Sequence, residues 1–308
     1  MEEVYDNQSK YIFGGVQELI KYQEVEKDKI KKYWETRLPQ TWYSSKKVGS
    51  LGWFNALEYE RYRTYYEYIP RVAEFDNHFG EDVLEIGVGV GTDIVQYAKG
   101  GAVVSGIDLT ESAVEMTREN LRIRGLGYTS LQVGDAEHLD FDDKSFDLVY
   151  CFGVLHHTPR PDHAIAEIHR VLKDGGKAII MLYARGWKHY FKRILIHGIL
   201  LGKWLKYGYN KLVSLQTEVH GASPLTYVYT KKEIERLFSS FGEVSITRYR
   251  LGEYFDYAPY HTKKVPLAVK NVMDLFAMGR LVGENYIIKA VKTPECSRHS
   301  FWRTLLAP

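Results

Sequence analysis

Residues 84–93 read LEIGVGVGTD and contain the three glycines that decide the fold. The apolar run at residues 83–86 predicts a short buried strand, and residues 93–99 predict a helix directly after the glycines. Glycines at such a turn let the backbone approach a ligand that a Cβ atom would hold away. The segment therefore predicts a nucleotide-type ligand at the carboxyl edge of a sheet, near the start of a helix.

The sequence on both sides continues this alternation of strands and helices. Thr110 is typical of a helix N-cap, the apolar spacing over residues 164–172 predicts a helix that Gly175 and Gly176 end, and Thr230-Lys231-Lys232-Glu233 is a capping box. Further strands are expected at residues 102–107, 130–133, 146–151, 177–183, 244–249 and 286–291. This rhythm predicts an α/β fold with a parallel, doubly wound sheet.

The chain is expected to form one main domain with additions. The expected parts are an N-terminal helical cap (1–80), the sheet domain (81–293), two insertions within it after the fifth strand (184–229) and before the last strand (251–283), and a C-terminal tail (294–308). Within the cap, residues 15–37 and 55–75 predict helices.

The first insertion contains a basic, aromatic stretch at residues 185–211, which has no acidic residue. Such a stretch suits either a lid over the site or an interfacial helix on a membrane. Gly198 and Gly202 weaken a long continuous helix, which favours the lid.

Composition restricts the partners. The 308 residues include 41 basic and 39 acidic side chains, so the net charge of +2 disfavours a nucleic-acid partner. Two distant cysteines give neither a disulfide framework nor a zinc pattern, and no metal site is expected. The polar start predicts no signal peptide, and no apolar run has the ~20 residues of a membrane span. We expect a cytoplasmic protein with a small-molecule partner; the oligomeric state is not indicated.

Asp108 ends the second predicted strand, about 20 residues after Gly87, and Leu109 follows it. This spacing suits a carboxylate that accepts hydrogen bonds from ribose hydroxyls, in a nicotinamide dinucleotide or in S-adenosylmethionine. The dinucleotide fingerprint needs Gly or Ala at position 92, where this chain has Thr92. The third glycine is Gly91, and S-adenosylmethionine has no pyrophosphate, so the loop favours the latter ligand.

Three further motifs follow in order: Gly134-Asp135-Ala136, Phe146 to Cys151, and Lys173-Asp174-Gly175-Gly176. With them, residues 83–183, and more loosely 228–292, resemble the class I S-adenosylmethionine-dependent methyltransferases, especially those that act on small molecules. The resemblance implies a Rossmann-like seven-stranded sheet whose last strand is antiparallel. It also implies methyl transfer from S-adenosylmethionine to an oxygen, nitrogen, sulfur or carbon of a small metabolite.

The resemblance also implies which residues bind the cofactor. The glycines shape the site for the methionine moiety, Asp108 holds the ribose, and Asp135 with Ala136 holds the adenine. The whole predicted set is Glu85, Gly87, Gly89, Gly91, Asp108, Leu109, Asp135, Ala136 and Cys151. The family usually has Lys-Pro-Gly-Gly at residues 173–176, so Asp174 departs from the pattern at a structural turn.

Two candidate catalytic residues, His156 and His157, are adjacent in the sequence after the fourth predicted strand. Either can take a proton from the acceptor, or the pair can simply line the pocket. The sulfonium is already a strong electrophile, so a base is not compulsory. His156 is the preferred base because it is nearer the strand, and Tyr227 and Tyr229 are candidate walls of the substrate pocket.

Three rival functions differ in what the sequence must contain. A nicotinamide-dependent oxidoreductase is disfavoured by Thr92. A DNA amino-methyltransferase usually has Asp/Asn-Pro-Pro-Tyr after the fourth strand, where this chain reads Cys151-Phe152-Gly153-Val154. A cofactor-binding protein that has lost its chemistry would retain the same glycines and acids.

Overall fold

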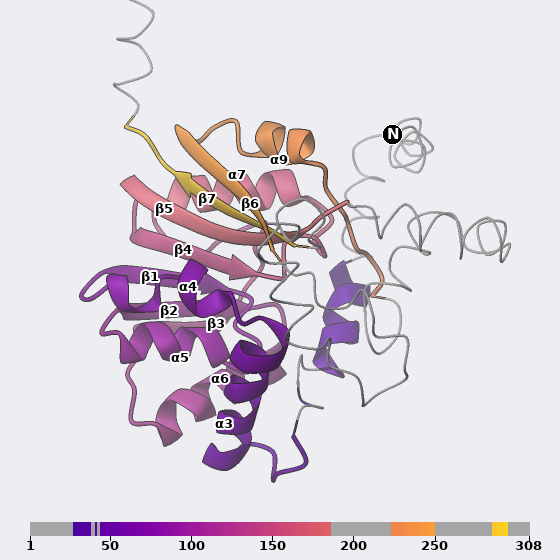
Figure 1. The fold of residues 1–308 in the computed structure, drawn as a ribbon, viewed down its shortest axis with the longest axis vertical. Coiled ribbons are helices and arrows are strands. Elements are labelled where there is room, and N and C mark those ends of the chain that lie inside the picture. Colours follow the sequence, from indigo (N-terminus) through magenta and orange to yellow (C-terminus); the bar gives the residue numbers. More distant parts are fainter. Residues whose placement is uncertain (1–26, 38–40, 42–43, 186–222, 250–284, 295–308) are drawn as a thin grey trace, which may run out of the picture.

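A computed structural model describes residues 27–37, 41, 44–185, 223–249 and 285–294 (Figure 1). These residues contain a sheet of seven strands in the order β3-β2-β1-β4-β5-β7-β6. The strands are β1 Asp82–Ile86, β2 Val103–Asp108, β3 Ser130–Val133, β4 Phe146–Phe152, β5 Leu172–Tyr183, β6 Glu243–Tyr249 and β7 Asn285–Val291. The first five strands pair in parallel, and β7 is antiparallel to both β5 and β6. The predicted doubly wound sheet with an antiparallel last strand is confirmed.

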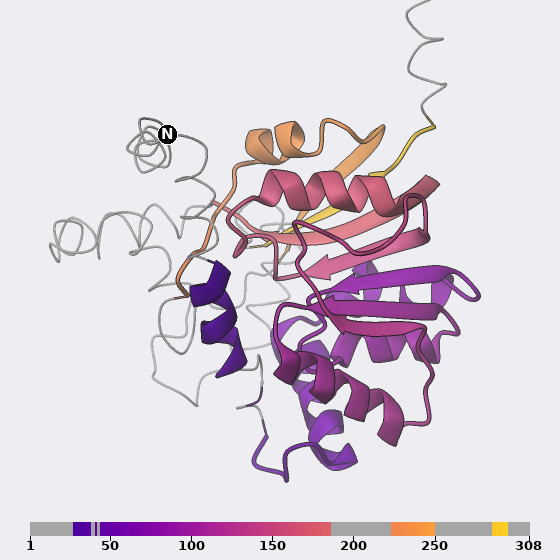
Figure 2. The same cartoon turned by 180° about the vertical axis from the view of Figure 1, so that it is seen from behind.

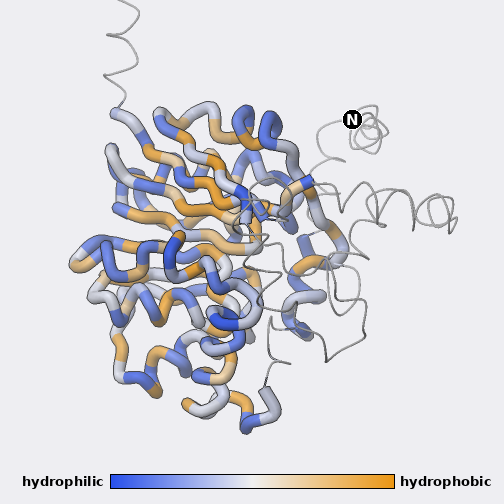
Figure 3. Tube along the Cα trace, in the orientation of Figure 1, coloured by the Kyte–Doolittle hydropathy of each residue, from blue (hydrophilic) through white to orange (hydrophobic). Residues whose placement is uncertain are grey.

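Helices cover both faces of the sheet because each strand buries side chains alternately on its two sides. The helices are 27–35, α3 Leu51–Glu60, α4 Ile69–Val72, α5 Thr92–Lys99, α6 Glu111–Ile123, α7 Pro161–Val171 and α9 Lys231–Leu237. Residues of α7 and α9 share one apolar cluster with the sheet, and residues of α4, α5 and α6 share the other. Figure 2 shows these layers from behind, and Figure 3 shows the hydrophobic strands between them. Among the described residues, no helix has the length and apolar character to span a membrane.

The predicted helix 55–75 differs from the structure in its start and its continuity. It begins at Leu51, because the Ser50 hydroxyl accepts a hydrogen bond from the Trp53 amide and caps the helix. A π-helical turn over Arg61–Tyr65 interrupts it before α4. This interruption puts a buried arginine next to the glycine loop.

The predicted helix 164–172 ends one residue early, at Val171. Leu172 has extended backbone angles and pairs with Phe146, so it begins β5. Gly175 and Gly176 therefore lie within the first half of β5 rather than at the helix end. The capping box of α9 is confirmed, since Thr230 and Glu233 exchange both of its hydrogen bonds.

The predicted division into domains stays a prediction. Most of the first insertion, all of the second, the first 26 residues and most of the tail lie outside the described residues. The basic stretch 185–211 lies there too, apart from Arg185.

Candidate functional site

The glycine loop joins β1 to α5, and its glycines have different surroundings. At Gly87, with φ +82°, a Cβ atom would lie 2.1 Å from Cγ2 of Val154 in the loop after β4. At Gly89, with φ +56°, a Cβ atom would meet no atom of the described residues within 4 Å. Gly91 is the residue before α5. Gly87 is thus required by packing, whereas Gly89 borders open space.

Asp108, at the end of β2, holds this loop. Its Oδ2 accepts a hydrogen bond from the Gly89 amide at 3.1 Å, and its Oδ1 accepts from the amide and hydroxyl of Thr110 at 3.0 and 2.9 Å. Burial raises the pKa of Asp108, and the three donors act against that rise. A carboxylate has about four lone-pair sites, so one more donor can be accepted.

Thr110 stands where a helix N-cap was predicted, but its side chain makes no capping hydrogen bond to α6. Its hydroxyl donates to Asp108 instead. The position of the cap was therefore predicted correctly, and the partner of its hydroxyl was not.

Glu85, in β1, is buried, and its Oε2 atom has no hydrogen-bond partner in the part of the chain that the structure describes. Burial, together with the charge of Asp93, raises its pKa well above the usual range. An unpaired buried oxygen in a native site calls for an explanation. A bound cation next to the glycine loop would supply the missing donor.

A buried ion pair lies beneath the loop and was missed from the sequence. Asp93, in the first turn of α5, accepts hydrogen bonds from Arg61 Nε at 2.7 Å and from the hydroxyls of Tyr62 and Tyr150 at 2.7 and 2.9 Å. Arg61 Nη2 also pairs with Asp93 Oδ2, so the ion pair is bidentate. The sequence feature that could have indicated this ion pair is Asp93, two residues after Gly91, together with Arg61, which lies among several tyrosines.

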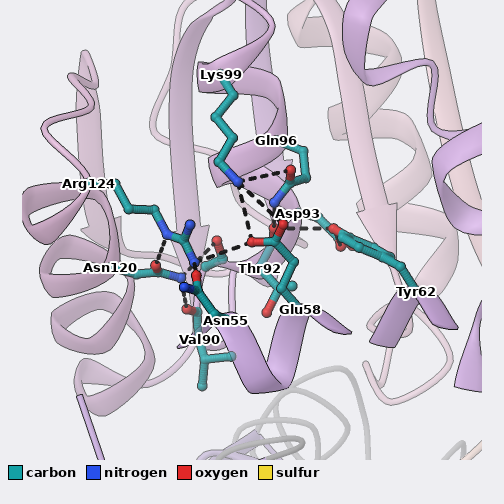
Figure 4. A network of polar contacts seen from close by, with 11 residues as sticks. Asn55, Glu58, Tyr62, Val90, Thr92, Asp93, Gln96, Lys99, Asn120 and Arg124 are labelled. Atoms are coloured by element: carbon teal, nitrogen blue, oxygen red, sulfur yellow. Dashed lines mark hydrogen bonds and ion pairs between the residues drawn. The ribbon is translucent and has the colours of Figure 1, made fainter. Parts of the chain in front are cut away.

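A second set of contacts fastens α3 to the same loop (Figure 4). Lys99 and Arg124 both pair with Glu58 of α3, at 3.3 and 3.2 Å. Asn120 of α6 donates to the Val90 carbonyl at 2.9 Å. These contacts tie α3, α5, α6 and the loop into one unit.

The predicted adenine residues follow β3. Asp135 Oδ1 accepts a hydrogen bond from the Glu137 amide at 2.9 Å, and its Oδ2 accepts one from Lys27 at 2.5 Å. Ala136 and Cys151 belong to the apolar cluster under this edge. Burial raises the pKa of the Cys151 thiol, so this side chain is neutral and contributes packing.

The two histidines lie in the turn after β4 in different environments. His156 is fully buried, and its ring stacks on Tyr183 with centroids 3.8 Å apart. Within the described ranges, neither of its ring nitrogens has a hydrogen-bond partner. Burial, with a smaller effect of His157, lowers its pKa well below the usual value. His157 Nδ1 lies 2.8 Å from the Leu225 carbonyl, so a neutral His157 carries its proton on Nδ1.

Of the predicted substrate residues, Tyr227 contacts this turn and Tyr229 lies beside the end of β5. The Tyr227 amide donates to the His156 carbonyl at 2.8 Å, and the Tyr229 amide donates to the Tyr183 carbonyl at 2.9 Å. The buried Tyr229 hydroxyl has no partner. The described residues contain no cluster that could hold a metal ion. The glycine loop, the acids and the histidines all adjoin the carboxyl ends of β1 to β4, and their ligand contacts stay predictions.

Comparison with known proteins supports a methyltransferase domain in this part of the chain. Residues 84–180 match a family model described as a methyltransferase domain. Phosphoethanolamine N-methyltransferase 2 of Caenorhabditis elegans is 29% identical over 152 residues, which are 49% of this chain and 35% of that protein. A ubiquinone biosynthesis O-methyltransferase of Coxiella burnetii is 32% identical over 116 residues, 38% of this chain and 49% of that protein. The chain thus spans half or less of these relatives' length.

Solved structures share the fold at low identity. Haemonchus contortus phosphoethanolamine N-methyltransferase 2, in complex with S-adenosyl-L-methionine, has a TM-score of 0.53 and 17% identity, covering 86% of this chain and 60% of that one. The [4+2]-cyclase SpnF has a TM-score of 0.50 and 17% identity, covering 86% of this chain and 95% of that one. The family match shows that residues 84–180 contain a methyltransferase domain, and the sheet around them has the strand order β3-β2-β1-β4-β5-β7-β6.

Proposed function

We propose that this protein binds S-adenosylmethionine at the glycine loop and transfers its methyl group to an oxygen, nitrogen, sulfur or carbon atom of a small molecule. S-adenosylhomocysteine is the coproduct. The main support for this proposal is the open space at Gly89. Asp108 holds the loop that contains Gly89, and the strand before the loop contains Glu85 with its unpaired oxygen. A glycine with room beside it, at the carboxyl edge of a doubly wound sheet, is where a nucleotide-type ligand binds.

The donors of S-adenosylmethionine suit the acids of this edge. Its ammonium group matches the unpaired oxygen of Glu85, a ribose hydroxyl matches the remaining acceptor capacity of Asp108, and the adenine amino group matches Asp135. A dinucleotide would instead bring a pyrophosphate to the loop, and its fingerprint needs Gly or Ala at position 92, where this chain has Thr92. This contrast supports S-adenosylmethionine over a nicotinamide cofactor.

His156 is the proposed base if the acceptor must lose a proton. Its imidazole is neutral, because its pKa is lowered by burial, and neither ring nitrogen has a hydrogen-bond partner among the described residues. Because His156 is fully buried, a hydroxyl or amine of the acceptor would supply the missing hydrogen bond only after the side chains that cover the ring move. Positioning the acceptor in line with the sulfonium methyl supplies the rest of the catalysis.

The acceptor is proposed only as a small metabolite. One relative is named for phosphoethanolamine and another for ubiquinone biosynthesis, so the relatives differ in acceptor. A role in small-molecule biosynthesis and a cytoplasmic location are parts of the same proposal, as are the lining roles of Tyr227 and Tyr229.

A labelling experiment tests methyl transfer directly. The protein is incubated with methyl-labelled S-adenosylmethionine and a metabolite extract, supplemented with phosphoethanolamine, and labelled products are sought by mass spectrometry. We expect one labelled small molecule and an equal amount of S-adenosylhomocysteine. Binding of the cofactor without any labelled product would instead identify a catalytically silent cofactor-binding protein.

Asp108→Ala is expected to weaken S-adenosylhomocysteine binding by about 1.5–3 kcal/mol, because a charged acceptor of hydrogen bonds is lost. Isothermal titration of wild type and variant measures this change. Asp147→Ala is the matched control, since Asp147 also accepts a hydrogen bond from a backbone amide, that of Asp82 at 2.9 Å, but lies at the start of β4. Equal affinities of the Asp108 variant and the wild type would exclude a ribose contact.

A further inference from the structure

Helix 27–35 lies beyond the edge of the sheet toward which the parallel strands point, as both views of the fold show (Figures 1 and 2). It is the first described segment of the chain and touches elements far from it in sequence. Its Ile30 is buried, while Lys31 and Lys32 face solvent. The helix is therefore docked on the domain by one face.

Lys27 connects this helix to the predicted adenine segment. Its ammonium lies 2.5 Å from Asp135 Oδ2 and also pairs with Glu137. Burial alone would lower the pKa of Lys27, but hydrogen bonds to the two carboxylates raise it, so the ammonium stays charged. Glu137 in turn accepts a hydrogen bond from the Arg160 amide at 2.7 Å, after β4. Lys27 thus fixes a loop that reaches from β3 to the region after β4.

Glu35 connects the other end of the helix to the predicted ribose segment. Its Oε1 accepts a hydrogen bond from the Ser112 amide at 3.0 Å, in the first turn of α6. Thr110 leaves this turn without a side-chain cap, because its hydroxyl is engaged with Asp108. Glu35 therefore caps α6 from a distant part of the chain, and its charge also raises the pKa of Asp108.

Trp34 makes the third connection, to the histidine turn. Its ring centroid lies 5.2 Å from that of His157. Lys27, Ile30 and Trp34 are spaced three and four residues apart, so they share one face of the helix. Helix 27–35 thereby contacts segments that follow β2, β3 and β4, which carry the proposed ribose, adenine and acceptor contacts.

We propose that helix 27–35 is a lid that retains the cofactor, with Lys27 and Glu35 as its fastening and positioning residues. The inference rests on the proposed function, because it assigns these two side chains to the same cofactor site. Lys27 orients Asp135 through the contact with Oδ2 while leaving it acceptor capacity for the adenine amino group. Entry and release of the cofactor require these contacts at the two ends of the helix to open.

The test compares Lys27→Met with Lys31→Met, the same chemical change on the exposed face of the same helix. Stopped-flow and isothermal titration measure the dissociation rate and the affinity of S-adenosylhomocysteine. Lys27→Met should raise the dissociation rate and Kd about ten-fold, the effect of losing a hydrogen bond to a charged group. Lys31→Met should match the wild type, and Lys27→Arg should restore most of the retention because it keeps the charge.

Two further measurements separate a lid from a general loss of stability. Melting temperatures without ligand should be the same for Lys27→Met and Lys31→Met, and hydrogen exchange over residues 27–35 should slow when S-adenosylhomocysteine is added. If Lys27→Met does not fold, Glu35→Ala serves as the second variant with the same expected faster release, because it removes the acceptor for the Ser112 amide.

Each outcome bears on a distinct claim. Tighter binding by Lys27→Met would mean that Lys27 competes with adenine for Asp135, and unchanged kinetics would mean that the helix does not retain the ligand; either result overturns the lid. If wild-type protein shows no binding at all, the proposed function itself fails and the lid fails with it.

Discussion

Asp93→Ala is expected to lower the free energy of unfolding by about 3–5 kcal/mol, the cost of leaving one member of a buried ion pair without its partner. Arg61 would remain buried with its charge uncompensated, and the hydroxyls of Tyr62 and Tyr150 would lose their shared acceptor. Such a loss is a large fraction of the ~5–15 kcal/mol that stabilises a typical domain. Urea unfolding followed by circular dichroism measures it.

Two companion variants make the result specific. Glu119→Ala removes an exposed i,i+3 pair with Arg122 and should leave the melting temperature unchanged. The double variant Arg61→Met/Asp93→Leu should be clearly more stable than Asp93→Ala, because no buried charge is left alone. If Asp93→Ala is as stable as the Glu119 variant, this ion pair does not fix the glycine loop.

His156→Ala is expected to lower the turnover rate by about 10²–10⁴-fold, the range for loss of a general base, with cofactor affinity unchanged. The rate is measured with the acceptor that the labelling experiment identifies. If His156 only shapes the pocket, the loss will appear mainly in KM. A His157→Ala enzyme without turnover, beside a His156→Ala enzyme with full turnover, would assign the base to His157 instead.

The pH dependence of the wild-type rate follows from the burial of His156. Only the neutral imidazole accepts a proton, and burial lowers the pKa of His156 well below 6.5, its usual value. The base is therefore already competent at neutral pH, and the rate should stay level from about pH 6 to 8. It should fall only in more acidic solution, as the pH passes through the lowered pKa. A rise of the rate centred on the pKa of an unperturbed histidine would contradict this environment for the base.

The strands and the glycine loop could be predicted because their signals are local. A buried strand such as β1 is short and has apolar residues at three of its positions, Val83, Leu84 and Ile86, and the glycines at 87–91 mark the turn after it. The start of β5 could not be predicted in the same way. Leu172 continues the apolar spacing of α7, and only its pairing with Phe146 in the sheet makes it a strand residue.

The contacts that complete the site were not predictable because they join distant residues. Lys27 and Asp135 are 108 positions apart, and no periodicity connects them. Thr110 has the residue type and position of a helix cap, yet Asp108 takes its hydroxyl and Glu35 supplies the cap from 77 positions away. Sequence patterns indicate where a polar side chain stands; the fold decides which partner it has.

The most direct test of the account is whether S-adenosylhomocysteine binds at Gly89. Gly89→Ala and Gly125→Ala form a matched pair, because both glycines have positive φ, +56° and +67°, and at both positions a Cβ atom would meet nothing within 4 Å. Both variants therefore carry similar backbone strain, and only Gly89 borders the proposed cofactor. Isothermal titration should show binding by the wild type and Gly125→Ala and at least about ten-fold weaker binding by Gly89→Ala. No heat with the wild type, or equal affinity in both variants, would contradict a cofactor site at this loop.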